Sequence, residues 1–396
     1  MSRKIGKQKE KNKLSCDKII LLFALALAIF GAIMIFDASV YVANSEKNNP
    51  FYYLTHQLIW LLFGGLFGFI FYKIDYRKLL KFSLPIYIIT IILLVAVLFL
   101  AKDINGAKRW FSIGSLPPIQ PAEFAKLFVI FYLSTWISKN SYFTKQKSDE
   151  DFKKSFIKNI ISFGVILSLI ALPILLEPDL GTTLMILATS FCMFLIAKED
   201  NRHYIYNLGL LLLSAPLVLI TIAIEPYRLK RFSTYLNLML TGEVADPQAT
   251  GYQMQQILIG IGSGGLLGTG FGQSRQRFGY LVENTAFTDS IFAVVLEEIG
   301  WLGGIMLITA WLLFFWRGLR IANKAPDKEG KLLATGITIW LTLQTFMNMA
   351  ANLGIIPLTG IPAPLLTYGG SSTIITIIAI AILLNISKYC TNERKS

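Results

Sequence analysis

The side chains best suited to chemistry gather in a polar stretch, residues 225–289, that interrupts an otherwise apolar chain. The stretch opens with a basic cluster containing Arg228, Lys230 and Arg231, and it closes with the carboxylate of Asp289. Guanidinium and ammonium groups are the usual partners of phosphate, and a positioned carboxylate can take a proton from a bound ligand. The pattern predicts a site for an anionic ligand, with Asp289 as the candidate catalytic residue.

A second basic cluster, Lys108 and Arg109 followed by Trp110, lies in the loop after the third apolar run. Cations are disfavoured in loops that must cross the membrane, so their presence here indicates a use. The alternative is that they extend to lipid headgroups and bind no ligand. Both clusters contain aromatic residues among the cations, which favours the interpretation that they bind a ligand.

The elements that position these residues are apolar. Hydrophobic residues make up 54% of the chain and charged residues 15%. The apolar residues fall in runs of about 20, the length that spans a bilayer, and no alternating strand pattern repeats. We therefore predict an all-α polytopic membrane protein with about ten transmembrane helices. The predicted spans are 19–39, 57–74, 80–101, 122–138, 157–176, 180–197, 203–224, 289–316, 331–352 and 371–388.

Basic residues concentrate in the tail 1–18, in the loops 139–158 and 317–331, and at the C-terminal end. With ten spans these segments share one side of the membrane, which the positive-inside rule makes cytoplasmic. We expect one transmembrane domain, 19–388, followed by a second cytoplasmic tail, 389–396, with the first span retained because it lacks a cleavage signal. Residues 225–289 then form a large extracytoplasmic loop between the seventh and eighth spans. The net charge of +13 reflects this topology rather than nucleic-acid binding.

Within the large loop, residues 254–272 are apolar and glycine-rich but short for a span. They could dip into the outer leaflet as a re-entrant helix or lie flat on the surface. At the end of the loop, residues 288–290 also match a helix N-cap signature centred on Asp289. A cap would not exclude catalysis, because a helix N-terminus favours an ionised carboxylate. Glu283 precedes Asp289 as a candidate partner.

Other acids lie within or between the spans. Glu297 and Glu298 fall inside the eighth span, where ionisable groups are usually functional, and we expect at least one to pair with a neighbouring helix. Glu123 and Lys126, three residues apart at the start of the fourth span, can form an ion pair of their own. Residues 177–183 form a tight turn on the outer side, and its acids could face the same extracytoplasmic cavity as Asp289.

Several common chemistries have no support in the sequence. The three cysteines, Cys16, Cys192 and Cys390, suggest neither disulfides nor a metal site, and the two histidines lie far apart. No nucleophile elbow, zinc-protease motif, P-loop or dinucleotide fingerprint occurs in a usable context. We predict no dedicated metal site.

Short motifs in a fixed order nevertheless resemble those of the SEDS family (shape, elongation, division and sporulation proteins, including FtsW and RodA). These are integral-membrane polymerases of peptidoglycan, and the resemblance covers nearly all spans. The matching motifs are GAKRW at 106–110, QPAEFAK at 120–126, EPDLGT at 177–182, GYQ at 251–253, GSGG at 262–265, DSIFA at 289–293, EEIG at 297–300, PLTGIP at 357–362 and YGGSS at 368–372.

The resemblance implies roles for individual residues. Asp289 occupies the position of the family's catalytic acid, and Trp110 that of a tryptophan implicated in handling the lipid-linked substrate. The implied substrate-binding residues are Lys108, Arg109, Trp110, Glu123, Lys126, Arg228, Lys230, Arg231, Gln253, Gln256, Ser263 and Glu283.

The chain departs from the family in the loop before Asp289. The family's Leu-Pro-Glu-x-His-Thr-Asp-Phe is replaced by a slightly longer segment, LVENTAFTDS at 281–290, without the proline and the histidine. No role for that histidine can be carried over. The motif at 251–253 leans toward the division branch of the family.

The resemblance implies glycosyl transfer between lipid II molecules in the bacterial plasma membrane, at an extracytoplasmic site. The C4 hydroxyl of one sugar would attack the anomeric carbon of another and displace undecaprenyl diphosphate. Asp289 would be the base, with Arg109, Arg228, Lys230 and Arg231 as candidates to bind the diphosphate. Direct displacement predicts inversion at the anomeric carbon. No cofactor is expected beyond a divalent cation that could share the diphosphate charge.

The same resemblance implies a partner, a single-span class B penicillin-binding transpeptidase, together with other division or elongation proteins. Two alternatives stay open. A lipid II flippase would have the same topology and substrate but form no bond, and a noncatalytic scaffold would dock division proteins through its outer loop and basic tails.

Overall fold

The computed structural model describes residues 16–101, 108–112, 118–140, 149–197, 226–245, 251–278 and 282–390. Apart from an isolated bridge between Phe111 and Ile119, these residues form helices and their connections. The predicted all-α class is confirmed.

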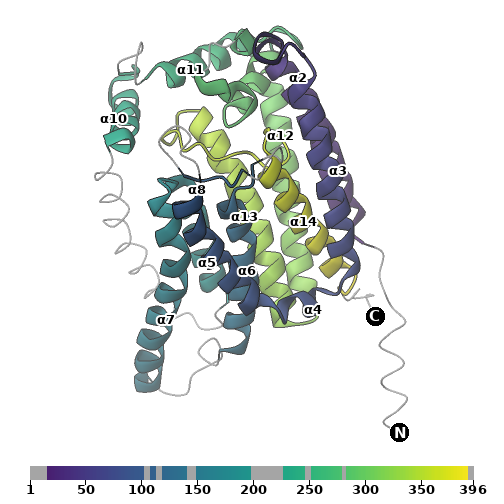
Figure 1. Ribbon diagram of the computed structural model, residues 1–396, viewed down its shortest axis with the longest axis vertical. Helices are drawn as coiled ribbons and strands as arrows, with labels where there is room; N and C mark the ends of the chain where they lie inside the picture. Colours follow the sequence, from purple (N-terminus) through teal and green to yellow (C-terminus); the bar gives the residue numbers. More distant parts are fainter. Residues whose placement is uncertain are drawn as a thin grey trace.

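Nine helices form the body of the bundle and run roughly along its long axis (Figure 1). In the described part of the chain they are α2 (Lys18–Lys47), α3 (Tyr52–Lys73), α5 (Ser83–Leu100), α6 (Pro121–Lys139), α7 (Asp149–Leu176), α8 (Leu180–Ile196), α12 (Ile291–Lys324), α13 (Lys328–Asn352) and α14 (Gly370–Ser387). Each predicted span among the described residues corresponds to one of these helices. The predicted span 203–224 lies outside the described residues.

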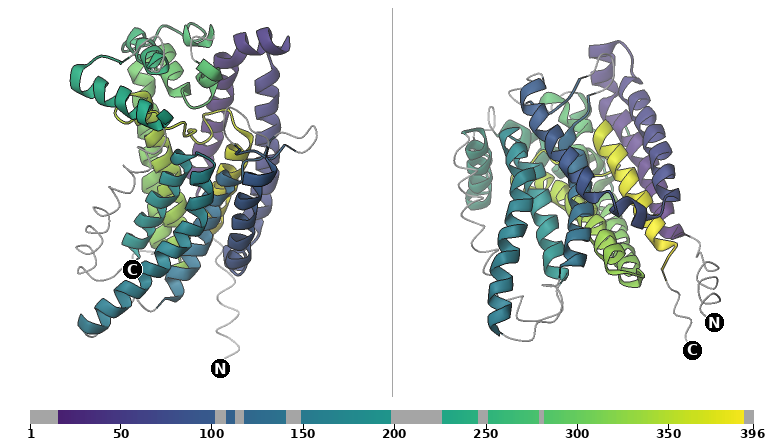
Figure 2. Two further views of the ribbon diagram at one scale, coloured as in Figure 1. Left: turned by 60° about the vertical axis from the view of Figure 1, so that its left-hand side comes forward. Right: turned by 60° about the horizontal axis from the view of Figure 1, so that its bottom comes forward.

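Shorter elements lie at the two ends of the bundle. The helix α4 (Tyr76–Leu80) lies at the lower end in Figure 1. The helices α10 (Pro226–Thr241) and α11 (Tyr252–Gly264) lie at the upper end, which we call the site end (Figures 1 and 2). Two 3-10 turns, η2 (Gln276–Phe278) and η3 (Val282–Phe287), then lead into α12.

The outer surface of the bundle is apolar. Six described helices or helix segments are long and apolar enough to cross a membrane: α2, α3, α5, residues 157–176 of α7, α12 and α14. Their exposed side chains include Leu22, Ile29, Leu62 and Leu66. Such large apolar side chains facing outward are stable in lipid rather than in water. The chain is therefore a multi-pass membrane protein.

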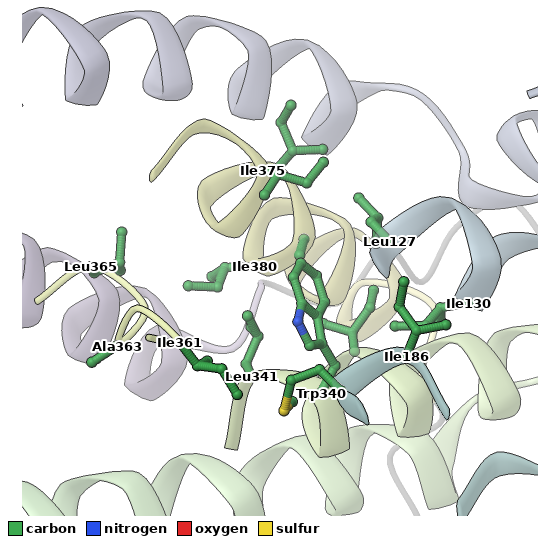
Figure 3. Packing of buried hydrophobic residues seen from close by; sticks show 14 of the residues in the cluster. Leu127, Ile130, Ile186, Trp340, Leu341, Ile361, Ala363, Leu365, Ile375 and Ile380 are labelled. Atoms are coloured by element: carbon green, nitrogen blue, oxygen red, sulfur yellow. The ribbon is translucent and has the colours of Figure 1, made fainter. Parts of the chain in front are cut away.

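The centre of the bundle lies between α6, α8, α13, α14 and the connection between α13 and α14, residues 353–369. Figure 3 shows buried side chains that these elements contribute to the core, with Trp340 among them. They include Leu127, Ile130, Ile186, Leu341, Ile361, Ala363, Leu365, Ile375 and Ile380. The connection between α13 and α14 is thus part of the core and not a loose loop.

The helices α3 and α14 approach closely because α3 presents glycines to α14. A Cβ atom on Gly64 would lie 2.7 Å from Ile377 Cδ1, and one on Gly68 would lie 2.9 Å from Ile377 Cγ2. Small residues of this kind allow close helix packing in membranes, where apolar burial alone gives little drive to association.

Polar contacts join several helix termini at the end opposite the site. Asp17, the N-cap of α2, pairs with Arg317 near the end of α12 at 2.6 Å, and its N–H donates to Ser387 at the end of α14. Tyr76 of α4 donates to Asp327, the N-cap of α13, at 2.7 Å. The predicted topology requires these termini to share one end, and they do. Which side of the membrane this end faces stays a prediction.

The helix α12 is interrupted at Gly300, whose φ is +75°. The segment after α11 supplies backbone hydrogen bonds at this break, so that the polar groups freed by the kink are satisfied. The N–H groups of Thr269 and Gly270 donate to the carbonyls of Glu297 and Glu298. The N–H groups of Trp301 and Leu302 donate to the carbonyls of Gly265 and Leu266. The glycine-rich segment is therefore joined to the helix that follows Asp289.

Candidate functional site

Asp289 lies immediately before α12, at the site end. The helix begins at Ile291 and its N-cap is Ser290, so the predicted capping role of Asp289 is wrong. The reason is local: residues 288–290 form a turn in which the Ser290 N–H donates to the Thr285 carbonyl, and this turn moves Asp289 out of the cap position. The Thr288 hydroxyl donates to Asp289 Oδ1 at 3.1 Å. The carboxylate is partly exposed.

The connection between α13 and α14 lies beside this carboxylate. Gly360 has φ +68°, a conformation that favours glycine, and a Cβ there would lie 3.8 Å from Asp289 Oδ2. The PLTGIP motif at 357–362 therefore lies next to the candidate catalytic residue, although sequence reasoning assigned no site residue to it.

Two predicted binding residues reach the same place from the large loop. Arg231 of α10 donates to the Leu358 carbonyl at 3.0 Å, and Gln253 of α11 donates to the Ser290 hydroxyl at 3.4 Å. Lys230 lies on the exposed face of α10, and Gln256 is partly buried on α11. The side chain of Arg228 lies outside the described residues, as does that of Glu283.

Arg109 approaches the site through the turn between α7 and α8. Its guanidinium donates to the carbonyls of Glu177 at 2.8 Å and Pro178 at 2.7 Å. At the start of α8, a Cβ on Gly181 would lie 2.9 Å from the Thr359 carbonyl oxygen, so this turn packs against the same connection. The centre of the Trp110 ring lies 6.0 Å from the Arg109 guanidinium carbon. Lys108 is exposed.

The turn also contains a buried acid. Glu177 has no exposed surface, and neither carboxyl oxygen accepts a hydrogen bond from the described residues. Burial raises its pKa to about 9, with a smaller rise from the charge of Asp179 and an opposing effect of Arg109. Glu177 is therefore neutral at pH 7. Asp179 accepts from the Thr182 N–H at 2.9 Å and caps α8.

Glu123 and Lys126 do not lie on the site surface. They form the predicted ion pair at 2.8 Å, and both side chains are buried inside the bundle. Lys126 also donates to Gln344 Oε1 at 3.0 Å, which links the pair to α13. That they bind substrate stays a prediction, and the structure gives them a contact with α13 instead.

Ser263 belongs to a separate polar cluster around the two acids of α12. Its hydroxyl donates to Glu297 Oε1 at 3.3 Å. Ser274 donates to Glu297 through its hydroxyl at 2.5 Å and to Glu298 through its N–H at 3.1 Å. The expectation that at least one of these acids is used in structural pairing is confirmed. Glu297 lies six residues beyond Ile291, the first residue of α12, and therefore roughly 9 Å along the helix from its start beside Asp289.

Two residues that sequence reasoning missed contact Asp289 directly. Asn348 and Asn352 of α13 both donate from Nδ2 to the Asp289 carbonyl, at 2.7 and 2.9 Å. The sequence offers only a weak indication of their role, namely that an amide side chain recurs at every fourth residue of a mostly apolar run. Among the described residues, no three histidine, cysteine or acidic side chains are grouped to hold a metal ion. A divalent cation at the site stays a prediction.

An apolar groove of about 880 Å³ runs along the bundle between α2, α3 and α14. Its lining includes Leu25, Ile29, Leu58, Gly65 and Ile377, and almost all of its surface is apolar. Leu365 of the α13–α14 connection also lines the groove. The groove and Asp289 therefore contact the same connection.

The fold and site define a polytopic membrane protein whose candidate acid and arginines gather at one end of the bundle. The chain belongs to the FtsW, RodA and SpoVE family of cell cycle proteins, whose model matches residues 17–392. This confirms the resemblance to the SEDS family.

Individual relatives cover nearly the whole chain. It is 36% identical to stage V sporulation protein E of Bacillus subtilis, over 95% of this chain and 98% of that protein. It is also 36% identical to a Legionella pneumophila protein named "Probable peptidoglycan glycosyltransferase FtsW", over 93% of this chain and 90% of that protein.

Solved structures share the fold. The rod shape determining protein RodA of Thermus thermophilus has a TM-score of 0.67 at 23% identity, over 96% of this chain and 100% of that chain. A structure described as "Structural coordination of polymerization and crosslinking by a peptidoglycan synthase complex" has a TM-score of 0.75 at 25% identity, over 94% and 98%.

Proposed function

We propose that this chain is a peptidoglycan glycosyltransferase that polymerises lipid II into glycan strands for cell division or cell shape. Family membership supports this, because several relatives are named probable peptidoglycan glycosyltransferases. The observation that carries the assignment to a site is the position of Asp289 at one end of the bundle. Its partly exposed carboxylate lies beside the α13–α14 connection, and the helix that bears Arg231 and the turn that binds Arg109 pack against the same connection.

In the proposed reaction, the C4 hydroxyl oxygen of the acceptor sugar forms a bond to the anomeric carbon of the donor. The bond from that carbon to the diphosphate oxygen breaks, and the electron pair leaves with undecaprenyl diphosphate. Asp289 takes the proton of the attacking hydroxyl. A single carboxylate acting as base, without a covalent intermediate, gives inversion.

The leaving diphosphate needs positive charge near it. Arg231 donates to the Leu358 carbonyl of the α13–α14 connection, and Arg109 donates to two carbonyls of the α7–α8 turn that packs against this connection, which fixes where their charge lies. Lys230 lies one residue from Arg231 on the exposed face of α10. We assign these three residues to the diphosphate, with Arg228 as a further candidate and a divalent cation as an optional partner.

The polyprenyl tail of the substrate needs an apolar path beside this site. The groove between α2, α3 and α14 offers one, since its lining is apolar and Leu365 joins it to the connection that contacts Asp289. We assign the tail to this groove.

The setting proposed for the enzyme follows from the same argument. The site end faces the extracytoplasmic side of the plasma membrane, with both termini in the cytoplasm. A class B penicillin-binding protein is the proposed partner, which the likeness to a peptidoglycan synthase complex supports.

The test is polymerisation of labelled lipid II by the full-length protein, purified with its transpeptidase partner. Replacing a general base lowers turnover by roughly a hundred- to ten-thousand-fold, so Asp289→Ala should abolish visible glycan strands. Glu243→Ala, which removes an exposed acid from the same loop, is the matched control and should polymerise normally.

Two outcomes would contradict the proposal. Strands of normal length from the Asp289→Ala protein would remove Asp289 as the base. Transport of fluorescent lipid II across vesicles without any polymer from the wild type would favour a flippase.

A further inference from the structure

A row of amide side chains runs along one face of α13. Gln344, Asn348 and Asn352 are spaced four residues apart, so they lie above one another on the helix. All three are almost fully buried. A buried amide is costly unless it is hydrogen-bonded, so the partners of this row show what it is used for.

The partners lie around the candidate site. Besides sharing the Asp289 carbonyl with Asn352, Asn348 donates to the Ile361 carbonyl at 2.8 Å. Gln344 donates to the Pro362 carbonyl, also at 2.8 Å. The row therefore bonds both Asp289 and the neighbouring residues 361–362 of the α13–α14 connection to one helix, α13.

The row is held at its other end by a buried ion pair. Gln344 Oε1 accepts from Lys126 Nζ at 3.0 Å and from Trp340 Nε1 at 2.7 Å, which fixes the orientation of its amide. Lys126 is in turn paired with Glu123. A continuous polar chain thus runs from Glu123 through Gln344 to the connection beside Asp289.

The amide oxygens of Asn348 and Asn352 lower the stability of the folded protein. Among the described residues, nothing donates to Asn348 Oδ1 or Asn352 Oδ1, and both atoms are buried. A buried acceptor without a hydrogen bond destabilises the folded state. A face selected for stability alone would be filled better by apolar side chains, whereas two amides that meet at one carbonyl restrict the backbone there.

We infer that Asn348 and Asn352 are positioning residues that hold the Asp289 carboxylate in its working orientation. Fixing the Asp289 carbonyl restricts rotation of the peptide that follows it, and hence the direction of the Asp289 Cα–Cβ bond. Asn348 sets the Ile361 carbonyl at the same time, so the carboxylate and the neighbouring Gly360 keep a constant separation. The inference rests on the proposed function of Asp289.

The test uses Asn348→Leu and Asn352→Leu, which keep the branching and the number of side-chain heavy atoms but remove the N–H donors. Each variant should lower kcat for lipid II polymerisation roughly ten- to a hundredfold while KM stays within about twofold, because a small displacement of a reacting group lowers turnover and not binding. The matched control is Asn385→Leu. Asn385 is equally buried, and its amide donates to the Tyr72 carbonyl at the opposite end of the bundle. The control should lose a similar amount of thermal stability and keep its kcat.

A second measurement does not depend on polymerisation. In an Asp289→Cys background, the rate of maleimide labelling at position 289, followed by mass spectrometry, reports the orientation and access of that side chain. Adding Asn348→Leu should change this rate several-fold, and adding Asn385→Leu should leave it unchanged.

The outcomes separate the inference from the proposed function. If the wild type makes no polymer, the proposed function fails, and the labelling rates still decide whether the asparagines orient position 289. If the wild type polymerises but the α13 variants keep normal kcat and normal labelling, the inference is overturned.

Discussion

The carboxyl group of Glu177 shows how one residue can reverse the usual pH dependence of stability. Because burial raises its pKa to about 9, the folded protein binds a proton here that the unfolded chain releases above about pH 4.5. The stability that this group contributes is complete below pH 4.5 and is lost as pH rises toward 9. We expect Glu177→Gln, which stays neutral, to remove this loss.

The melting temperature in detergent, measured for wild type and Glu177→Gln at pH 5 and pH 8, checks this prediction. The variant should gain a few degrees over the wild type at pH 8 and little at pH 5. Exposed Glu243→Gln should show no such difference. Parallel pH curves for Glu177→Gln and wild type would mean that the Glu177 side chain is solvated.

The candidate site could be predicted at some residues and not at others. Asp289 was predictable because its position combines a carboxylate, the end of a polar loop and the start of an apolar run. Asn348 was not, because its partner is 59 residues away and nothing local distinguishes it from an amide that faces a neighbouring helix. The Glu123–Lys126 pair was predictable from its spacing, but its link to Gln344 needed the fold.

At the scale of elements, the glycine-rich segment after α11 acts as a backbone partner of α12. Gly268 has φ +82°, and a Cβ there would lie 2.0 Å from the Glu298 carbonyl oxygen. Gly268→Ala should therefore separate this segment from the break in α12, at a cost of at least about 2 kcal/mol from backbone strain and lost hydrogen bonds.

Thermal melting and limited proteolysis within residues 251–278 measure the effect. Gly262→Ala is the control, because it lies in α11 with open space around its Cβ and no unusual φ. A Gly268→Ala protein that melts and resists protease like Gly262→Ala would show that the segment does not need its close approach to α12.

The elements themselves followed from run length, since a membrane-embedded helix must be long and apolar and its backbone can bond only within itself. That is why the predicted spans among the described residues match helices. The relation of α11 to α12 did not follow, because it depends on a kink at Gly300 that creates unpaired backbone groups. Sequence periodicity does not reveal that backbone groups at a break in one helix are hydrogen-bonded by another segment.

At the scale of the whole molecule, two adjacent glycines of α3 have different surroundings. Gly64 packs against Ile377 of α14, whereas Gly65 lines the apolar groove between α2, α3 and α14, and no described atom lies within 4 Å of a Cβ on Gly65. Adjacent glycines thus serve assembly and the groove separately. Gly64→Leu should prevent folding of the bundle, whereas Gly65→Leu should fold normally and fill part of the groove.

Gly65→Leu then tests whether the groove holds the substrate's tail. The added side chain would displace roughly two methylene groups of the tail, each worth about 0.8 kcal/mol, so KM for lipid II should rise roughly tenfold. KM for an analogue with a short prenyl chain that does not reach Gly65 should stay unchanged, as should the melting temperature. An equal rise in KM for both substrates would indicate a general disturbance of the fold. No rise for either would place the tail on another face of the bundle, while leaving the assignment of Asp289 intact.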